Sequence, residues 1–365
     1  MKRTLFFVWL LIPAVLSAGQ IPLKDVPSKS EWKFVPEKIW EVDKAGDDDF
    51  GRIAELLILD EGRVCLRDFG KNISYLFDAD GHFIKKFAPQ GKEDGQLSFY
   101  LNRFRAGGKI VLAAPDKLHF FSPDGVFERA VANDLFQRFP LSFIDEDEFI
   151  CAPNFPRSPV QERKLILVDL KSGQDRVLVD FSGPGQQVET APPGPMLMIF
   201  GLTPQVRLAA EGGRMFFGRS DRYEIFVADR SGKVLSSFGL ARERLTASLE
   251  DKRKQIAGTR IPDDQKEKII AQLPSEMTFF SHIEAIQGFV YVFAVSDLEQ
   301  RTGSQRVDIF SETGEYLYRG RLAFGEGLEF GSPANILLTD GYAYVVLVNG
   351  QGKQTLAKYR IKLPR

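Results

Sequence analysis

Histidine and cysteine are scarce in this chain, and neither sign of charge is in excess. The 365 residues include 3 His and 2 Cys, and 48 Lys and Arg stand against 49 Asp and Glu. So few His and Cys side chains leave little material for a soft-metal site or for histidine-based catalysis. A net charge of −1 without a basic run gives no electrostatic footprint for nucleic acid. The composition therefore predicts no nucleic-acid partner, no metal and no cofactor.

Long apolar runs are also missing, with one exception near the start of the sequence. A basic pair at positions 2 and 3 precedes an apolar run at positions 5–16, and small residues follow at positions 17–19. This is the pattern of a secretory signal peptide, and a run of twelve is short for a membrane helix, which needs about 20 residues. We expect cleavage after Ala18 or Gly19, so that residues 1–19 are a signal peptide and the mature chain is secreted or periplasmic without an integral membrane segment. A retained membrane anchor is the alternative.

Phenylalanine is abundant, with 31 residues, and one kind of turn recurs five times. Each copy has an apolar residue, a few small or polar residues, and then a glycine. Glycine accepts the positive φ that tight hairpin turns require. The copies end at Gly81, Gly125, Gly173, Gly232 and Gly314. These turns predict β-hairpins along most of the chain.

A second repeat lies upstream of these turns, where six short segments are almost wholly apolar. They begin at Gly62, Gly108, Asp147, Gly213, Gly288 and Gly341. Apolar residues on both faces indicate strands that are covered on both sides, as in stacked sheets. Sets of four short strands repeating every 40 to 50 residues or so are typical of propeller blades. The sequence therefore predicts an all-β, six-bladed β-propeller of four-stranded blades over residues 36–365.

Two further segments complete this prediction. The sixth copy lacks an outer strand, and residues 38–42 alternate apolar and charged side chains, so we expect this N-terminal strand to complete blade six and close the ring. Residues 241–275 break the β-pattern with helical spacing over 242–256 and 263–273. They predict an αα insertion between blades four and five, either packed on the rim or acting as a lid or docking element.

The first repeat, with its Phe-Asp-Ala-Asp-Gly turn at 77–81 and a glycine-containing linker at 91–95, resembles an NHL-type repeat. Over residues 36–365 the chain resembles the secreted bacterial six-bladed β-propeller proteins, most of which have no assigned function. Blades three and four lack the aromatic-Asp turn. The resemblance implies the fold and leaves the activity open.

The two cysteines fall in strands of different predicted blades. Cys65 lies in blade one and Cys151 in blade three, at positions whose alternation points them to opposite faces. A disulfide needs Cα atoms within about 7 Å, and a whole blade separates the two positions. We therefore predict two free, buried thiols.

Candidate ligand-binding residues cluster at the expected mouth of the central channel, where inner strands begin and the loops after second strands emerge. The inner-strand positions that are polar are Asn102, Arg207, His282 and Asn335, and the loops offer Arg67, Asp68, Arg157, Arg219 and Asp221. Arginine beside Asn or Asp can bind a carboxylate or a sugar. A polar, water-filled channel without a specific ligand is the alternative.

The function that these features favour is an exported, monomeric binding or protein-interaction propeller whose partner is a protein or a small polar or carbohydrate ligand. No His-Glu-x-x-His, Cys-x-x-Cys or Gly-rich phosphate motif is present, which favours a binding module over an enzyme. The alternative is a metal-dependent hydrolase or lyase of the lactonase-like propeller type, which needs convergent carboxylate, Asn or His ligands that a fold alone does not supply.

Overall fold

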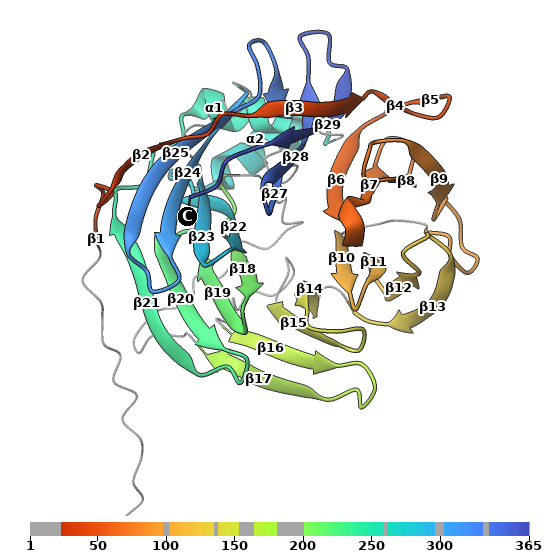
Figure 1. Ribbon diagram of the computed structural model, residues 1–365, viewed down its shortest axis with the longest axis horizontal. Coiled ribbons are helices and arrows are strands. Elements are labelled where there is room, and N and C mark those ends of the chain that lie inside the picture. Colours follow the sequence, from red (N-terminus) through yellow and green to blue (C-terminus); the bar gives the residue numbers. More distant parts are fainter. Residues whose placement is uncertain are drawn as a thin grey trace, which may run out of the picture.

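The six predicted sheets stand around a common axis in the computed structural model (Figure 1). The structure describes residues 23–97, 102–134, 138–152, 164–180, 201–257, 261–295, 303–330 and 336–364. The six-bladed β-propeller with predominantly four-stranded blades is confirmed.

Blades 1 to 3 are each built from four consecutive strands that pair antiparallel in chain order, from the axis outwards. They are β6 (Ile53–Ile58), β7 (Val64–Asp68), β8 (Ile73–Phe77) and β9 (Phe83–Phe87) in blade 1, β10 (Asn102–Ala106), β11 (Lys109–Ala113), β12 (Lys117–Phe121) and β13 (Phe127–Ala132) in blade 2, and β14 (Phe139–Phe143), β15 (Glu148–Ala152), β16 (Lys164–Asp169) and β17 (Asp175–Asp180) in blade 3. A one-turn 3₁₀ helix (Asp60–Gly62) joins β6 to β7.

Blades 4 to 6 follow the same plan with additions. Their strands are β18 (Val206–Glu211), β19 (Arg214–Arg219), β20 (Glu224–Asp229) and β21 (Val234–Ala241) in blade 4, β22 (Phe280–Ile286), β23 (Phe289–Ala294), β24 (Ser304–Ser311) and β25 (Tyr316–Ala323) in blade 5, and β27 (Ile336–Thr339), β28 (Tyr342–Val348) and β29 (Gln354–Arg360) in blade 6. A short strand, β26 (Glu329–Phe330), also pairs with β28.

The apolar core is divided among the gaps between blades. The inner strands β6, β10, β14, β18, β22 and β27 contact one another in that order, and β27 contacts β6. Six apolar clusters of buried residues follow, one between each pair of neighbouring blades. Because side chains alternate along a strand, Val64 and Leu66 face blade 6 while Cys65 between them faces blade 2. Each blade is therefore buried only if both of its neighbours are present.

The hairpin turns use the same polar device in every blade. In the turn of blade 1, Asp78 Oδ1 accepts the backbone N–H groups of Asp80 at 2.9 Å and His82 at 2.8 Å. The blade 6 turn does the same through Asn349, which accepts the N–H groups of Gln351 and Lys353 at 3.0 Å each. The sequence analysis did not include this sixth turn, because its first polar residue is Asn, where the other five turns have Asp or Ser. Side chains that bond to the backbone two to four residues on stabilise such turns.

The ring is closed by strand β3 (Glu37–Val42), as predicted. It pairs antiparallel with β29 and so becomes the outer strand of blade 6. The indole N–H of Trp40 donates to the carbonyl of Ala79 at 2.9 Å, in the first turn of blade 1. Gly81 in that turn has φ +85°, and a Cβ there would lie 2.9 Å from the Trp40 ring. Glycine is thus needed at this position both for the turn and for the close packing of Trp40. A two-strand hairpin, β4 (Lys44–Ala45) and β5 (Asp48–Asp49), leads from β3 to blade 1.

The N-terminal segment extends the closure further than the sequence indicated. Strand β1 (Leu23–Lys24) pairs parallel with β21 of blade 4, and β2 (Ser30–Lys33) pairs parallel with β25 of blade 5. Together with β3, these strands run along the outside of blades 4, 5 and 6 (Figure 1). We call residues 23–42 the N-terminal strap.

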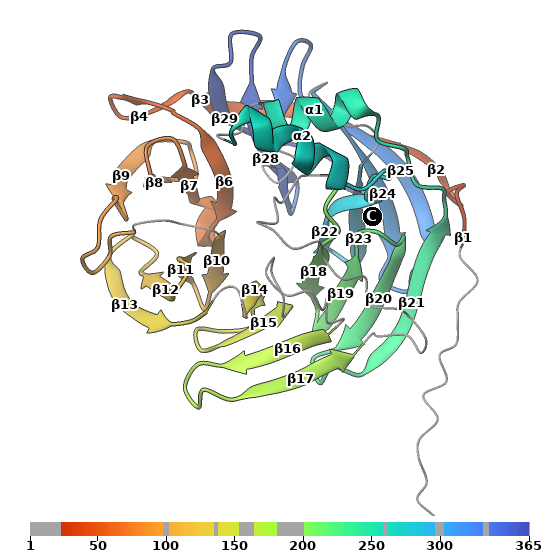
Figure 2. The same ribbon diagram turned by 180° about the vertical axis from the view of Figure 1, so that it is seen from behind.

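The insertion between blades 4 and 5 forms two helices, α1 (Leu249–Ala257) and α2 (Asp263–Gln272), on the face of the ring turned toward the viewer in Figure 2. Helix α1 begins seven residues later than expected, because Ser248 and Asp251 cap its N-terminus reciprocally, with N–H to oxygen distances of 2.9 and 3.1 Å. Buried side chains of the helices pack against Leu202 and Val295, as the rim-packing alternative predicts. In the described part of the chain, no helix has both the length and the apolar character to cross a membrane.

The cysteine prediction is confirmed and leads to a test. Cys65 and Cys151 are both free and buried, on opposite sides of blade 2. Burial raises the pKa of each thiol to about 12. We expect neither thiol to react with a disulfide reagent in the native protein at pH 8, and both to react once the chain is unfolded. Fewer than two reactive thiols in denaturant, without added reductant, would indicate a disulfide and contradict the structure.

Candidate functional site

Two of the predicted site residues, Arg207 and His282, come together in the structure. Arg207 lies near the start of β18 and His282 near the start of β22, and these inner strands of blades 4 and 5 contact each other. The charge of Arg207 acts on the titration of His282. Both residues lie near the end of the ring at which the inner strands begin. Asn335 and Arg157 lie outside the described residues.

Arg207 is a charged side chain with no counter-charge among the described residues. Its Nε is buried and has no hydrogen-bond partner, and no carboxylate in the described ranges pairs with it. Burial alone lowers the pKa of Arg207 to about 10, so the guanidinium stays charged at neutral pH. Glu211 lies on the same strand, four residues beyond Arg207, but does not pair with it. Its carboxylate accepts the backbone N–H groups of Gln287 at 2.6 Å and Gly288 at 3.1 Å. A largely buried, unpaired cation is costly.

His282 is held in place but only partly satisfied. Its ring stacks on Phe293 with 3.7 Å between centroids, and Nδ1 lies 3.0 Å from Ser281 Oγ. Nε2 is buried and has no hydrogen-bond partner among the described residues. Burial first, and then the charge of Arg207, lower the pKa of His282 to about 3, against an opposing contribution from the backbone of Ile336. The imidazole is therefore neutral at ordinary pH.

Glu284 belongs to the same group, although the sequence analysis did not include it. It is two residues beyond His282 on the same face of β22, with Oε1 at 4.0 Å from His282 Nε2. Its Oε2 accepts the N–H of Leu338 at 3.0 Å, and burial raises the pKa of Glu284 to about 8. The signal that would have found it is period-two alternation, since Glu284 is acidic in a strand that is otherwise mainly apolar.

Arg67 and Asp68 are bonded within the fold around blade 1. Arg67 is fully buried and donates to the carbonyl of Ala88 at 2.9 Å and to Asn72. Asp68 is also fully buried, and its carboxylate accepts three backbone N–H groups of neighbouring loops, from Gly51 at 2.6 Å and from residues 52 and 71 at 3.0 Å each. Both side chains thus anchor the loops around blade 1.

The remaining predicted residues have partners of their own. Arg219, the last residue of β19, forms an ion pair with Asp221 at 3.0 Å, and its backbone pairs with Val206, next to Arg207. Asn102 starts β10 in blade 2, across the ring from blade 5, and its Oδ1 accepts the N–H of Arg103 at 2.9 Å. Arg207, His282 and Glu284 thus form one group, Arg219 lies beside Arg207 in the sheet, and Asn102 lies apart from them.

The charges of this group add up to one positive charge at neutral pH. Arg207 is protonated, His282 is neutral, and Glu284 with a pKa of about 8 is mostly in its uncharged acid form. A guanidinium in a poorly hydrated setting binds a carboxylate strongly, and its fork of N–H groups suits the two oxygens. The arrangement is thus chemically suited to an anionic group, with neutral polar atoms beside it.

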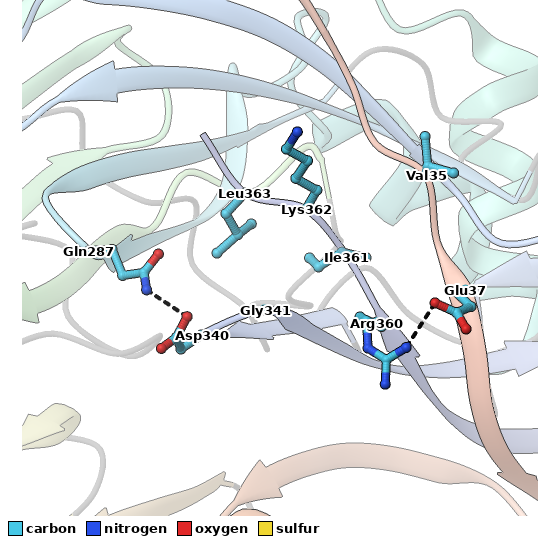
Figure 3. Close-up of a pocket in the computed structure, with 9 residues that line it drawn as sticks. All are labelled: Val35, Glu37, Gln287, Asp340, Gly341, Arg360, Ile361, Lys362 and Leu363. Atoms are coloured by element: carbon cyan, nitrogen blue, oxygen red, sulfur yellow. Dashed lines mark hydrogen bonds and ion pairs between the residues drawn. The ribbon is translucent and has the colours of Figure 1, made fainter. Parts of the chain in front are cut away.

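A cavity of about 380 Å³ lies at the opposite end of the ring, between blades 5 and 6 (Figure 3). Its walls come from the strap, the end of β29 and the turns after β22 and β27. Its polar side chains are mainly paired with each other, Glu37 with Arg360 at 3.0 Å and Gln287 with Asp340 at 2.5 Å, as the dashed lines in Figure 3 show.

Among the described residues, no three His, Cys, Asp or Glu side chains are grouped as a metal site requires.

Several solved structures share the fold. A member of the DUF4221 family from Bacteroides vulgatus is 13% identical with a TM-score of 0.57, covering 92% of this chain and 98% of that one. A candidate exported protein from Bacteroides fragilis is 12% identical with a TM-score of 0.53, covering 94% and 98%. A virginiamycin B lyase from Staphylococcus aureus is 10% identical, covers 91% and 90%, and has a TM-score of 0.42, too low to carry an argument.

At these identities the similarity defines a six-bladed propeller fold and nothing more specific. No protein-family model matches the sequence, and no curated protein is detectably similar to it.

The unpaired state of Arg207 can be tested against an arginine that is paired. Arg103 on β10 forms an ion pair with Glu55 at 3.2 Å and donates to the carbonyl of Leu56 at 2.6 Å. Arg103→Met should lower the free energy of unfolding by about 3 kcal/mol, because it removes both this ion pair and the hydrogen bond to the carbonyl of Leu56. Arg207→Met should change it by less than about 1 kcal/mol or raise it, because a costly charge is removed.

Thermal and urea unfolding of the two variants beside the unmodified protein measure this difference. A loss on Arg207→Met as large as that on Arg103→Met would show that the fold already compensates the Arg207 charge.

Proposed function

We propose that this protein is an exported, monomeric binding propeller, and that its ligand presents a carboxylate to Arg207 in the wall of the central channel. The observation that carries the proposal is the Arg207 guanidinium, whose buried Nε has no hydrogen-bond partner and which no carboxylate of the described residues neutralises. An anion from outside supplies the missing charge, and it gains an electrostatic interaction that is stronger at a poorly hydrated site than in water. His282 and Glu284 contribute neutral polar atoms beside that charge.

Binding is favoured over acid–base catalysis by the chemistry of His282. A general base works best with a pKa close to the working pH, and the pKa of His282 is about 3. The lactonase-like alternative requires several metal ligands that converge at the channel. The residues that the structure describes offer no such group, so this alternative would depend on the segments outside them.

Export is supported by the order of segments at the N-terminus. The signal-peptide pattern covers residues 1–19, and the first described strand begins at Leu23. Cleavage after Ala18 or Gly19 would thus leave the N-terminal strap whole. The Bacteroides fragilis protein of similar fold is itself a candidate for export.

The ligand class can be tested with simple carboxylates. We expect citrate or succinate to raise the melting temperature of the protein, because a ligand that binds only the folded state stabilises it. Arg207→Met should weaken binding at least about tenfold, the effect of losing one charge-assisted pair. The matched control is Arg105→Met, which removes an inner-strand arginine whose partner is the half-exposed Asp60. Isothermal titration calorimetry gives the affinities.

The pH profile of binding adds a second readout. Affinity should be constant between pH 6 and 7 and should fall above about pH 8, where Glu284 loses its proton and adds a negative charge to the site. Carboxylate binding that survives in the double variant Arg207→Met/His282→Ala would refute the site. Binding of a neutral sugar such as glucose, but of no carboxylate, would favour a carbohydrate ligand instead.

Export is tested by expressing the full chain in a bacterium with a periplasm. The periplasmic protein should have the intact mass of a chain lacking residues 1–18 or 1–19. Leu10→Arg, which places a charge in the apolar run, should block processing. Val26→Arg, an exposed position beyond the expected cleavage site, should be processed normally. An unprocessed chain that is recovered from the membrane would instead indicate an anchor.

A further inference from the structure

Between β1 and β2 along the chain, Asp25 fixes the N-terminal strap to the ring by an ionic contact. The carboxylate of Asp25 accepts from Arg242 Nε at 2.9 Å and from Arg242 Nη2 at 2.6 Å, a two-pronged pair. Arg319 donates to the same carboxylate, and to the backbone carbonyl of Asp25 at 2.9 Å. Burial tends to raise the pKa of Asp25, but the hydrogen bond and charge of Arg242 outweigh it, so the pKa is lowered. Asp25 is therefore ionised at neutral pH.

Behind this contact lies a buried carboxylate, Asp308 on β24. It is fully buried and accepts from the hydroxyl groups of Tyr223 and Tyr316 at 2.7 Å each. The remaining nitrogen of Arg242, Nη1, donates to Asp308 at 2.9 Å. Arg242 thus bridges the strap and the interior of blade 5.

The charge count of this group makes Asp25 important. Three arginines, at positions 242, 306 and 319, lie within 4 Å of one or both carboxylates. Asp25 and Asp308 supply two negative charges against these three positive ones. Without Asp25 one carboxylate would face three guanidinium groups, and repulsion would loosen their packing.

The same contacts continue from the strap toward the channel. The Arg242 guanidinium lies over the Tyr223 ring at 4.9 Å from its centroid. Tyr223 in turn packs edge-on against Phe279 and Phe280, with centroids 5.7 and 6.0 Å apart. Phe280 is the first residue of β22, the strand that carries His282. A continuous row of packed side chains therefore joins the strap to the start of this inner strand.

We propose that Asp25 is the clasp of a latch that holds the N-terminal strap on blades 4 and 5 and, through Arg242 and Tyr223, positions the start of β22 that carries His282. Asp25 and Arg242 are positioning residues, because neither contacts the group formed by Arg207, His282 and Glu284. The latch needs no ligand, so it stands whether or not Arg207 binds an anion.

Hydrogen exchange measured by mass spectrometry tests the latch. In Asp25→Asn, amides of residues 23–33 and of β22 should exchange about tenfold faster or more, because charge-assisted hydrogen bonds to the strap are lost. The matched control is Glu31→Gln, which removes a carboxylate from an exposed position of the same strap. In this control both regions should exchange as in the unmodified protein. Strand β12 of blade 2 serves as a distant reference that no variant should change.

Each other outcome overturns part of the proposal. If amides of the strap exchange at an unchanged rate in Asp25→Asn, Asp25 does not hold the strap. If they exchange faster while those of β22 do not, the strap does not position the strand that carries His282. Equal acceleration in β12 would mean a global loss of stability and no local latch. If Asp25→Asn does not fold, Arg242→Lys keeps the charge without the two-pronged geometry, and the same pattern is expected of it. Since no ligand is used, failure here is distinct from failure of the carboxylate site.

Discussion

Ring closure is the constraint on which this structure depends. The apolar side chains of each blade are buried against the next blade, so a blade with a missing neighbour would expose a whole cluster. Blade 6 has three strands of its own and takes its fourth, β3, from the N-terminus. Trp40 on that strand then packs against the first turn of blade 1. The pairing of β3 with β29 therefore secures the contacts between the last blade and the first.

The Arg207 group contrasts with other charged side chains of the interior. Asp68 accepts three backbone N–H groups, and Arg103 is paired with Glu55. Arg207 has a buried Nε without a partner and sits beside an imidazole with an unused nitrogen. Departures of this kind reduce stability, and natural proteins concentrate them where they act on another molecule. The position of this group, near one end of the ring, agrees with the proposed function.

The fold could be predicted from the sequence because its determinants are local. Each hairpin turn can be recognised by a glycine, which takes a positive φ, and by a polar residue that bonds to the nearby backbone. Strands with two apolar faces indicate stacked sheets. The strap could not be predicted in the same way. Strand β1 has two residues, pairs parallel with a partner more than 200 residues away, and carries no alternation to mark it.

The candidate site was predictable only where the repeat places residues at equivalent positions. Arg207 and His282 were found because the same position recurs in each inner strand, and adjacent inner strands bring them together. Arg67 and Asp68, at the end of β7, look exposed in the sequence, and only the folded structure shows the carbonyl and N–H groups that bind them. The state of a charge depends on neighbours from other blades, which no single segment reveals.

The strap also determines when the fold can be completed. Residues 23–42, made early in synthesis, pair with strands at 234–241, 316–323 and 354–360. The strap, though made early, must therefore wait unpaired until the last strands of the chain have been made. A chain that ends before β29 would have no place for β3, and β3 and β28 would both present open strand edges of the kind that leads to aggregation. The ring of this protein can therefore close only after the chain has been synthesised through β29.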